Sequence, residues 1–498
     1  MRISAWWACF LVPVLYLATI YSRQPGYRLS GPEGRPPARH RLLYDDYDAT
    51  AYALRGLNAW FGRPPGRLQE PPHYEPLDFA VLLQTAPSIG RETSPFFLEY
   101  PTVTLWFFEI PFFLPPALGP SSVSGALADG WHTNVVEHEP QTALERFIWH
   151  KLRFAVRTYE AIGIGALVAL MIVIRRGYGE LRLATLTAPL TPTPLPPEGE
   201  RGSTVSPQVP PAKADSLETF APPQHGNGDA GGTWTALLLL LPASLYFSAN
   251  RFDVLPALLV ASSLAALGRN RPVLSGCLLA VATLVKLYPA CIAMVVVVAL
   301  SRNPQRLGRW LAAFVATGVL VSVMTIAQFG WASWWAPYWY QFNRTQDSYD
   351  VSFYGVLWPA ALASNPIGKA FRLGTVLGVL ILALWSRPRR MDDVLRCSAA
   401  VLIVLVSVQA FYSPQWILWL APLLLPLGQR HAIFAAGYGL LDLITYLTFP
   451  AVSDWPMSSA RASCLDSLVW ARAIVLCALL VALIAGQCRS RYRMSPVD

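Results

Sequence analysis

The sequence predicts an all-α polytopic membrane protein with about 11 to 13 transmembrane or re-entrant helices. Hydrophobic residues make up 54% of its 498 residues, and the mean hydropathy is +0.37. Charged residues make up 14%, whereas a soluble domain carries roughly 25%. The apolar residues also fall into blocks that match the roughly 20 residues needed to cross a bilayer core. These observations argue against a soluble enzyme, a secreted disulfide-rich scaffold and a disordered protein.

The chain begins with an apolar block and a long polar stretch. Residues 5–21 follow Arg2 and lack a clean small-x-small cleavage site, which favours an uncleaved first helix over a signal peptide. Residues 22–99 are rich in Pro, Arg, Asp and Tyr and form a predicted large first external loop. The apolar block at 100–118 contains a glutamate and several prolines, so it either spans the membrane, re-enters it or lies at the interface.

The middle of the chain divides the protein into parts. Residues 157–174 form a clear span that ends in two arginines, and they belong to a first unit, 1–184. Residues 185–232 are rich in Pro, Ser, Thr and Gly without apolar periodicity, which predicts a disordered cytoplasmic linker. A multi-helix membrane domain at 233–488 and a cytoplasmic tail at 489–498 follow.

The second half alternates long apolar blocks with short connections. The blocks lie near residues 234–249, 252–268, 273–300, 310–329, 369–386, 396–411, 416–427, 432–449 and 469–486. Because cytoplasmic loops carry an excess of arginine and lysine, the arginine-rich connections are assigned to the cytoplasm. They are residues 268–272, 301–309, 386–390, 428–431 and 489–493. The external face then receives residues 250–253, 330–368, 412–415 and 450–466.

The block at 273–300 has arginines on both flanks, so both of its ends should be cytoplasmic. A single span cannot satisfy this requirement. We therefore expect a hairpin of two short helices that turns near Lys286–Pro289. The N- and C-termini are both predicted to be cytoplasmic, and the arginine-rich, lysine-poor composition suggests the plasma membrane of a bacterium.

Ionisable residues at or near membrane depth are the candidates for chemistry. Asp45, Asp46 and Asp48 form an acidic cluster in the first external loop, which is either a solvated turn or a site for proton transfer. Asn250 and Asp253 lie between two apolar blocks and are helix caps, site residues or both. Lys286 is deep in its block, where it either meets a lipid phosphate or pairs with a carboxylate such as Asp253.

Other patterns narrow the chemistry. Aromatic residues gather at 331–342 and 411–419, which fits an interfacial belt and also fits stacking on sugar rings. No phosphate-binding glycine-rich motif, metal-binding HExxH motif or CxxC pair occurs. The seven cysteines are interpreted as packing residues, and no metal or cofactor is expected. The net charge of +9 follows the loop arginines and does not predict binding to nucleic acid.

Four stretches in order along the chain resemble motifs of the GT-C superfamily of polytopic glycosyltransferases, nearest to the bacterial polyprenyl-phosphate-mannose-dependent mannosyltransferases. They are Asp48 with Tyr52 and Gly62, then Glu99-Tyr100-Pro101, then Asn250–Asp253 with the Lys286-Leu287-Tyr288-Pro289 hairpin, and finally residues 411–416. The sequence departs from the family pattern at Thr102, where a second proline is usual, and in long inserts in the first loop. The choice among the three aspartates therefore depends on the spacing of Asp48 to Tyr52 and Gly62.

The resemblance implies an inverting glycosyltransferase that moves a hexose, with mannose as the family-level expectation, from a polyprenyl-phosphate donor to a lipid or glycan acceptor at the external face. It implies Asp48 as the catalytic base, with Asp45 or Asp46 as alternatives. Lys286 and Arg344 would bind the donor phosphate. The residues expected to line the substrate site are Tyr52, Glu99, Tyr100, Asn250, Asp253, Tyr288, Gln346, Tyr412 and Gln415.

Two rival functions remain open at this point. A lipid or sugar transporter or flippase also needs charged residues at depth, although no internal repeat of the transporter kind is found. A polymerase or ligase of lipid-linked glycans would use a diphosphate-linked donor. The expected partners are the polyprenyl-linked sugar donor, the acceptor and membrane lipids.

Overall fold

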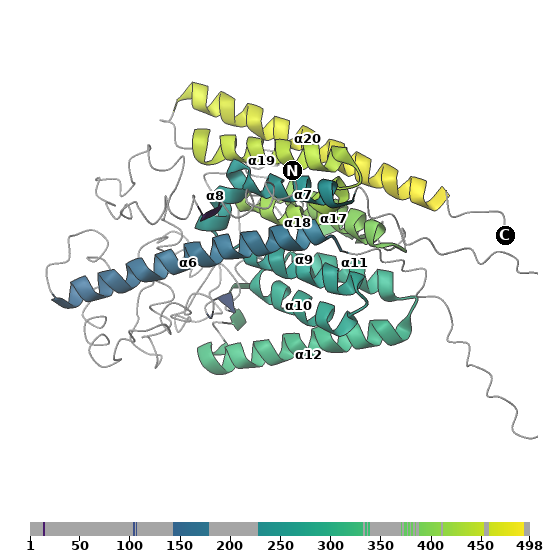
Figure 1. Cartoon of the computed structure of the whole chain (residues 1–498), viewed down its shortest axis with the longest axis horizontal. Coiled ribbons are helices and arrows are strands. Elements are labelled where there is room, and N and C mark those ends of the chain that lie inside the picture. Colours follow the sequence, from purple (N-terminus) through teal and green to yellow (C-terminus); the bar gives the residue numbers. More distant parts are fainter. Residues whose placement is uncertain are drawn as a thin grey trace, which may run out of the picture.

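The computed structural model describes residues 143–178, 228–331, 388–409, 412–452 and 458–492, together with isolated residues between and before these ranges. All regular elements of this described part are helices (Figure 1). They are α6 (Ala143–Arg176), α7 (Gly228–Leu237), the 3-10 turn η3 (Leu238–Leu240), α8 (Pro242–Asn250), α9 (Val254–Gly268), α10 (Pro272–Val285), α11 (Pro289–Leu300), α12 (Pro304–Phe329), α17 (Met391–Ser407), the 3-10 turn η4 (Pro414–Trp416), α18 (Ile417–Gly428), α19 (Ala432–Tyr446), the π-helical turn η5 (Leu447–Val452) and α20 (Ser459–Tyr492).

The helices confirm the predicted all-α polytopic membrane fold. Four described segments are long and apolar enough to cross a membrane: Arg157–Arg176, Pro304–Phe329, Ala432–Phe449 and Ser459–Cys488. The pair α8 and α9 passes the same test as one span that is bent by 108°. The helix α12 leaves most of its apolar side chains uncovered. A helix of this kind suits contact with lipid, because its backbone hydrogen bonds are satisfied within the helix.

Several helices extend beyond the predicted blocks. The helix α6 begins at Ala143 although the predicted span begins at 157, and α20 runs from Ser459 to Tyr492 although its block covers 469–486. Hydropathy detects only the part of a helix that suits lipid, whereas helical hydrogen bonding continues into polar residues. The helix α7 begins at Gly228, before the predicted end of the linker at 232.

Residues 273–300 form the predicted hairpin of two helices, with the break at Lys286-Leu287-Tyr288. Gly276 near the start of α10 packs on α12, where an added Cβ would lie 2.5 Å from the carbonyl oxygen of Trp310. Trp310 is near the start of α12, which directly follows the end of α11. The start of α10 and the end of α11 are therefore at the same end of the bundle.

The short basic connections meet at one end of the bundle, which we call the arginine-rich end. Gly268 at the end of α9 packs so closely on the carbonyl of Tyr178 that an added Cβ would lie 1.9 Å away from its oxygen. The Gln429 side chain donates a hydrogen bond of 2.7 Å to the carbonyl of Ile174. The loops that follow α6, α9 and α18 thus lie together, as the charge pattern predicts.

The arginine-rich end also contains a histidine in a cationic setting. Burial lowers the pKa of His431, and the nearby charge of Arg396 lowers it further. A neutral imidazole accepts a hydrogen bond, and Arg396 Nη2 lies 2.8 Å from His431 Nε2. Arg430 forms an exposed ion pair of 2.6 Å with Asp392 at the same end.

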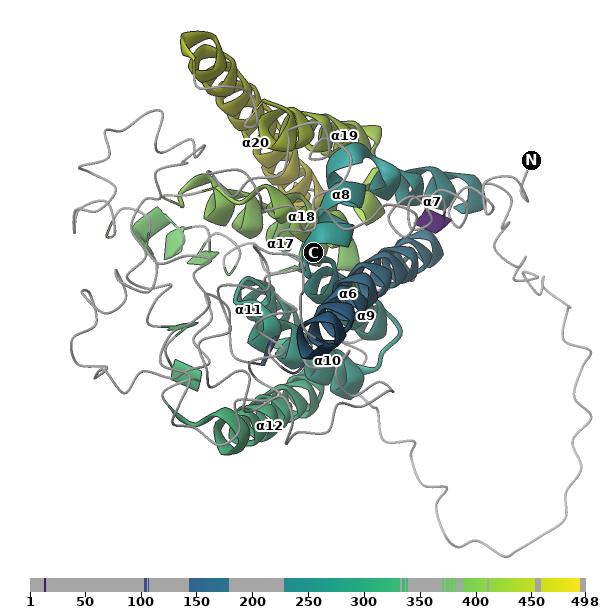
Figure 2. The same cartoon turned by 90° about the vertical axis from the view of Figure 1, so that its left-hand side faces the viewer.

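The opposite end, which we call the Asp253 end, collects the turn between α8 and α9, the break between α10 and α11, and the turn η4. Viewed along the bundle, α12 lies on one side and α19 and α20 lie on the other, with α6, α9 and α18 between them (Figure 2). The contacts of α18 with α9, and of α8 with η4, bring segments from the middle and the end of the chain together.

A carboxylate from α19 fixes the start of α8. The side chain of Asp442 accepts hydrogen bonds from the backbone N–H groups of Ala243 and Ser244 at 2.9 and 2.8 Å. It also accepts a bond of 2.5 Å from the Ser244 hydroxyl, which lies 2.7 Å from the hydroxyl of Tyr438. Since a helix leaves its first N–H groups without intrahelical partners, Asp442 caps α8 from another helix.

Replacing Asp442 by Ala is expected to lower the free energy of unfolding by about 2–4 kcal/mol, because buried donors of α8 lose their acceptor. Thermal unfolding of the purified protein in detergent measures the change. The exposed pair of Asp392 and Arg430 supplies the control, since Asp392→Ala should cost less than about 1 kcal/mol. Equal destabilisation by the two substitutions would contradict the role of Asp442 as a cap.

Candidate functional site

The turn between α8 and α9 presents Asp253 to the interior of the bundle. The helix α8 stops at Asn250 because the backbone of Arg251 is extended, with φ −131° and ψ 148°. The side chain of Asp253 is fully buried and makes no capping hydrogen bond to α9. The amide of Asn250 donates to the carbonyl of Tyr246 within its own helix. Asp253 therefore occupies the N-cap position of α9 while its side chain bonds elsewhere, and Asn250 is the last residue of α8.

Lys286 forms a buried ion pair with Asp253. The helix α10 ends at Val285, and the extended backbone of Lys286, with φ −150° and ψ 140°, follows it. The ammonium nitrogen lies 3.1 Å from Oδ1 and 3.4 Å from Oδ2 of Asp253. Lys286 is only 8% exposed. The predicted pairing of Lys286 with the carboxylate of Asp253 is therefore present in the structure.

Trp419 of α18 completes the cluster around this pair. Its indole N–H donates a hydrogen bond of 2.7 Å to Oδ1 of Asp253. Its ring stacks on Tyr288 with a centroid distance of 4.3 Å and an interplanar angle of 11°. The Lys286 ammonium also lies 4.8 Å from the ring centroid of Phe252 and 5.7 Å from that of Trp419. Three separate segments of the chain thus hold one charge pair between aromatic faces.

An aromatic row leads from this cluster to a second cation. Trp416 lies 5.1 Å from Trp419 and 5.5 Å from Tyr412, measured between ring centroids. The guanidinium of Arg472 on α20 stacks over the Tyr412 ring at 3.5 Å from its centroid. Arg472 is 2% exposed, so this cation is also inside the bundle. The row therefore has Lys286 at one end and Arg472 at the other.

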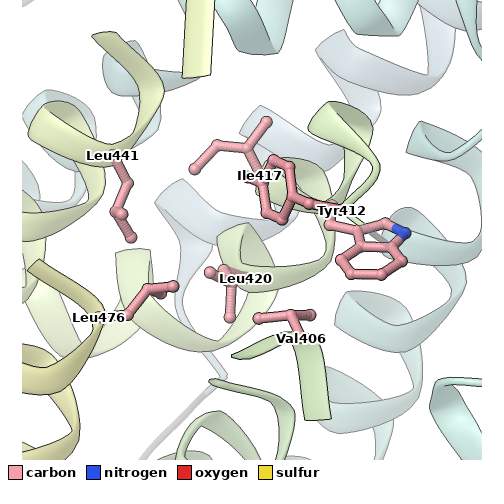
Figure 3. A pocket seen from close by; sticks show the side chains of 7 residues that line it. Val406, Tyr412, Ile417, Leu420, Leu441 and Leu476 are labelled. Atoms are coloured by element: carbon pink, nitrogen blue, oxygen red, sulfur yellow. The ribbon is translucent and has the colours of Figure 1, made fainter. Parts of the chain in front are cut away.

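A small apolar pocket adjoins the row (Figure 3). Its lining comes from α17, the segment around η4, α18, α19 and α20, and consists of Val406, Tyr412, Trp416, Ile417, Leu420, Leu441 and Leu476. Tyr412 is placed at this pocket with its hydroxyl 3.3 Å from that of Thr445. The pocket offers apolar contact next to an aromatic face and a cation.

Three of the predicted site residues have a buried polar atom without a hydrogen-bond partner. These atoms are Asn250 Oδ1, the Tyr288 hydroxyl and Gln415 Oε1. Their residues are 2–3% exposed, so solvent reaches them little. Leaving a buried polar atom unbonded costs roughly 1–3 kcal/mol, so a ligand that supplies the missing hydrogen-bond partners would be stabilised here.

The other predicted site residues lie outside the described part of the chain. They are Asp45, Asp46, Asp48, Tyr52, Glu99, Tyr100, Arg344 and Gln346. The described residues that were predicted, namely Asn250, Asp253, Lys286, Tyr288, Tyr412 and Gln415, all lie toward the Asp253 end. Within the described part, no group of three histidine, cysteine, aspartate or glutamate side chains is placed to hold a metal ion.

Sequence reasoning did not identify the buried pair of Arg157 and Glu160 on α6, or Arg472 on α20. These residues could have been found by the rule that identified Lys286, namely a charged residue inside or at the edge of an apolar block. The sequence pattern also placed Trp419 in an aromatic cluster, but it did not predict the hydrogen bond from Trp419 to Asp253. That bond joins residues 166 positions apart, which spacing does not reveal.

Comparison with known families identifies one matching region. Residues 218–414 match the model of glycosyltransferase family 87, a family of GT-C-type membrane glycosyltransferases. The matched region includes Asn250, Asp253, Lys286, Tyr288 and Tyr412. A comparison with curated proteins finds no match. The family match confirms the resemblance that was predicted from the motifs.

Proposed function

We propose a specific reaction for this membrane glycosyltransferase of the family-87 type. It transfers a hexose, with mannose as the first candidate, from a polyprenyl-phosphate donor to a lipid or glycan acceptor, with inversion at the anomeric carbon. The proposed location is the external face of a bacterial plasma membrane, with both chain termini in the cytoplasm. The observation that carries the proposal is the buried ion pair of Lys286 and Asp253, which lie within the family-matched region, together with the hydrogen bond that Trp419 donates to Asp253.

The ion pair suits a departing phosphate. When the bond between the anomeric carbon and the phosphate oxygen breaks, negative charge grows on the phosphate, and a fixed cation stabilises it. An ammonium has three hydrogen-bond donors, so Lys286 can contact Asp253 and a phosphate at the same time. Asp253 and the aromatic faces hold the ammonium in position. Arg344 is proposed as a second phosphate contact.

The remaining residues suit the sugar. Aromatic faces such as Tyr288 and Trp419 offer apolar contact to a sugar ring, and the oxygens of Asn250 and Gln415 accept hydrogen bonds from its hydroxyls. Tyr412 contributes a further aromatic face beside the apolar pocket. Tyr52, Glu99, Tyr100 and Gln346 are proposed to line the same site.

The proposed reaction is a single displacement. A carboxylate, assigned to Asp48 with Asp45 or Asp46 as alternatives, takes the proton of the acceptor hydroxyl. The hydroxyl oxygen bonds to the anomeric carbon as the bond to the phosphate oxygen breaks, and polyprenyl phosphate leaves with the electron pair. The developing positive charge on the ring is stabilised by nearby carboxylates, as in other glycosyl transfers. The proposed reaction needs no cofactor.

The test is sugar transfer by the purified protein in lipid vesicles, with lipid and glycan acceptors extracted from bacterial membranes. Donors are polyprenyl phosphates that carry mannose, glucose or arabinose, together with a diphosphate-linked glycan. We expect transfer from the mannosyl monophosphate at least about 10-fold faster than from the diphosphate, because the described cluster offers one cation, Lys286, to the phosphate. Transfer only from the diphosphate would favour a polymerase or ligase. Movement of lipid across the vesicle without transfer would favour a flippase.

A further inference from the structure

A buried carboxylate on α6 is outside the cluster described so far. Glu160 is fully buried, and its Oε2 accepts a hydrogen bond of 2.8 Å from Nη1 of Arg157. Its other oxygen, Oε1, has no hydrogen-bond partner. A buried carboxylate is stable only when its lone pairs are matched by donors, so a half-bonded carboxylate points to a missing donor.

The helix register puts Glu160 on the part of α6 that lies toward the end of α8, where Asn250 is the last residue. Residues three apart are neighbours on a helix surface, so Glu160 is on the side of α6 that carries Gly163. Gly163 packs directly on α8, where an added Cβ would lie 2.1 Å from the carbonyl oxygen of Ser248. The helix α8 ends two residues later, at Asn250. Glu160 is one turn of α6 nearer the Asp253 end than this contact, because α6 ends at the arginine-rich end.

The chemistry of the two residues defines what they bind. Asn250 uses its amide nitrogen on the Tyr246 carbonyl, which leaves the oxygen as its unpartnered atom. Glu160 Oε1 is also an acceptor. A matching ligand must therefore supply hydrogens. Arg157 already balances the charge of Glu160, which favours neutral hydroxyl groups over a cation.

We propose that Glu160 and Asn250 form a hydroxyl-binding subsite for a sugar ring, either of the donor or of the acceptor. The inference rests on the proposed function and extends the site from the α10–α11 hairpin to α6. Glu160 contacts substrate in this subsite, and Arg157 is a positioning residue that holds the carboxylate. A hydroxyl bound to a carboxylate is a charge-assisted bond, which is stronger than a bond to a neutral amide.

The experiment compares Glu160→Gln with wild type on a series of donors and acceptors that each lack one hydroxyl. The variant is expected to lose about 10- to 100-fold in kcat/KM with the full substrates. One deoxy compound should show a comparable loss with wild type and little additional loss with the variant. A deoxy donor with this behaviour assigns the subsite to the donor sugar, and a deoxy acceptor assigns it to the acceptor.

Asp466→Asn is the matched control, because Asp466 is an exposed carboxylate on α20. It should leave transfer unchanged. Glu160→Gln activity equal to this control would overturn the subsite while leaving the proposed function intact. So would a loss that is the same for every deoxy compound and is accompanied by a lowered unfolding temperature, since this describes a structural role. If Glu160→Gln does not fold, Asn250→Ser tests the same subsite with the same compounds. Absence of transfer by wild type from any donor would instead contradict the proposed function.

Discussion

Replacing Asp48 by Asn is expected to slow sugar transfer by about 10²–10⁴-fold, the range that general-base catalysis contributes. Asparagine has nearly the shape of aspartate and still accepts a hydrogen bond from the acceptor hydroxyl, but it does not take the proton. The loss should therefore fall on kcat, while the KM for the donor changes little. Initial rates in vesicles at several donor concentrations separate the two parameters.

Asp45→Asn and Asp46→Asn are the matched controls for this result, because they alter the same acidic cluster by the same change. Each is expected to reduce transfer less than about 10-fold if it only contributes charge near the reaction. A large loss in one of them, with Asp48→Asn active, would move the base to that position. The order of the three variants thus decides an assignment that spacing alone leaves between neighbours.

Replacing Asp253 by Asn is expected to lower the free energy of unfolding by about 3–5 kcal/mol, the usual result of removing one partner of a buried ion pair. The substitution preserves an acceptor for the Trp419 indole but leaves the Lys286 charge inside the bundle without its counter-ion. Lys286→Met should destabilise by a similar mechanism, with the carboxylate as the uncompensated charge. Thermal and denaturant unfolding in detergent measure both variants.

The double variant Asp253→Asn with Lys286→Met is the decisive member of this series. It removes both charges and is expected to recover most of the lost stability, because buried ion pairs contribute little net free energy beyond their desolvation cost. It should nevertheless remain inactive in transfer, since the proposed phosphate contact is absent. The exposed pair of Asp392 and Arg430 provides a control cycle with coupling below about 1 kcal/mol. Additive losses at 253 and 286 would mean that the two side chains act independently.

The sequence predicted the helices better than their ends. Blocks of apolar residues located α9, α12, α17, α18 and α19, and the arginines on both sides of 273–300 predicted the break at Lys286. The start of α6 at Ala143 was not predicted, because its first turns mix charged residues with apolar ones and so give no continuous apolar block. Apolar content reports where lipid surrounds a helix, and it carries no information on how far the hydrogen-bonded backbone continues.

The sequence predicted individual residues of the candidate site better than the contacts between them. Lone charges in apolar surroundings identified Asp253 and Lys286, and their pairing was one of two alternatives. The sequence favours a lipid phosphate as the partner of Lys286, because a lone cation near the external face suits an anion, and it does not show how close Asp253 comes. Glu160 was not predicted as a site residue, because it lies three residues after Arg157 at the start of the predicted span, where charged residues are usually solvated. Burial, which only the structure gives, separates that pair from an ordinary solvated edge.

The nine residues of α8 are attached firmly at both ends. Asp442 of α19 caps the first turn, and Asp253, which Lys286 and Trp419 bind, follows the last turn by three residues. A short helix with two fixed ends transmits a displacement of one end to the other, since its hydrogen-bonded backbone resists compression. Substitutions in α19 that shift Asp442 should therefore alter sugar transfer although they touch no substrate. The proposed transfer activity would then respond to changes in α19, which lies outside the proposed sugar-binding residues.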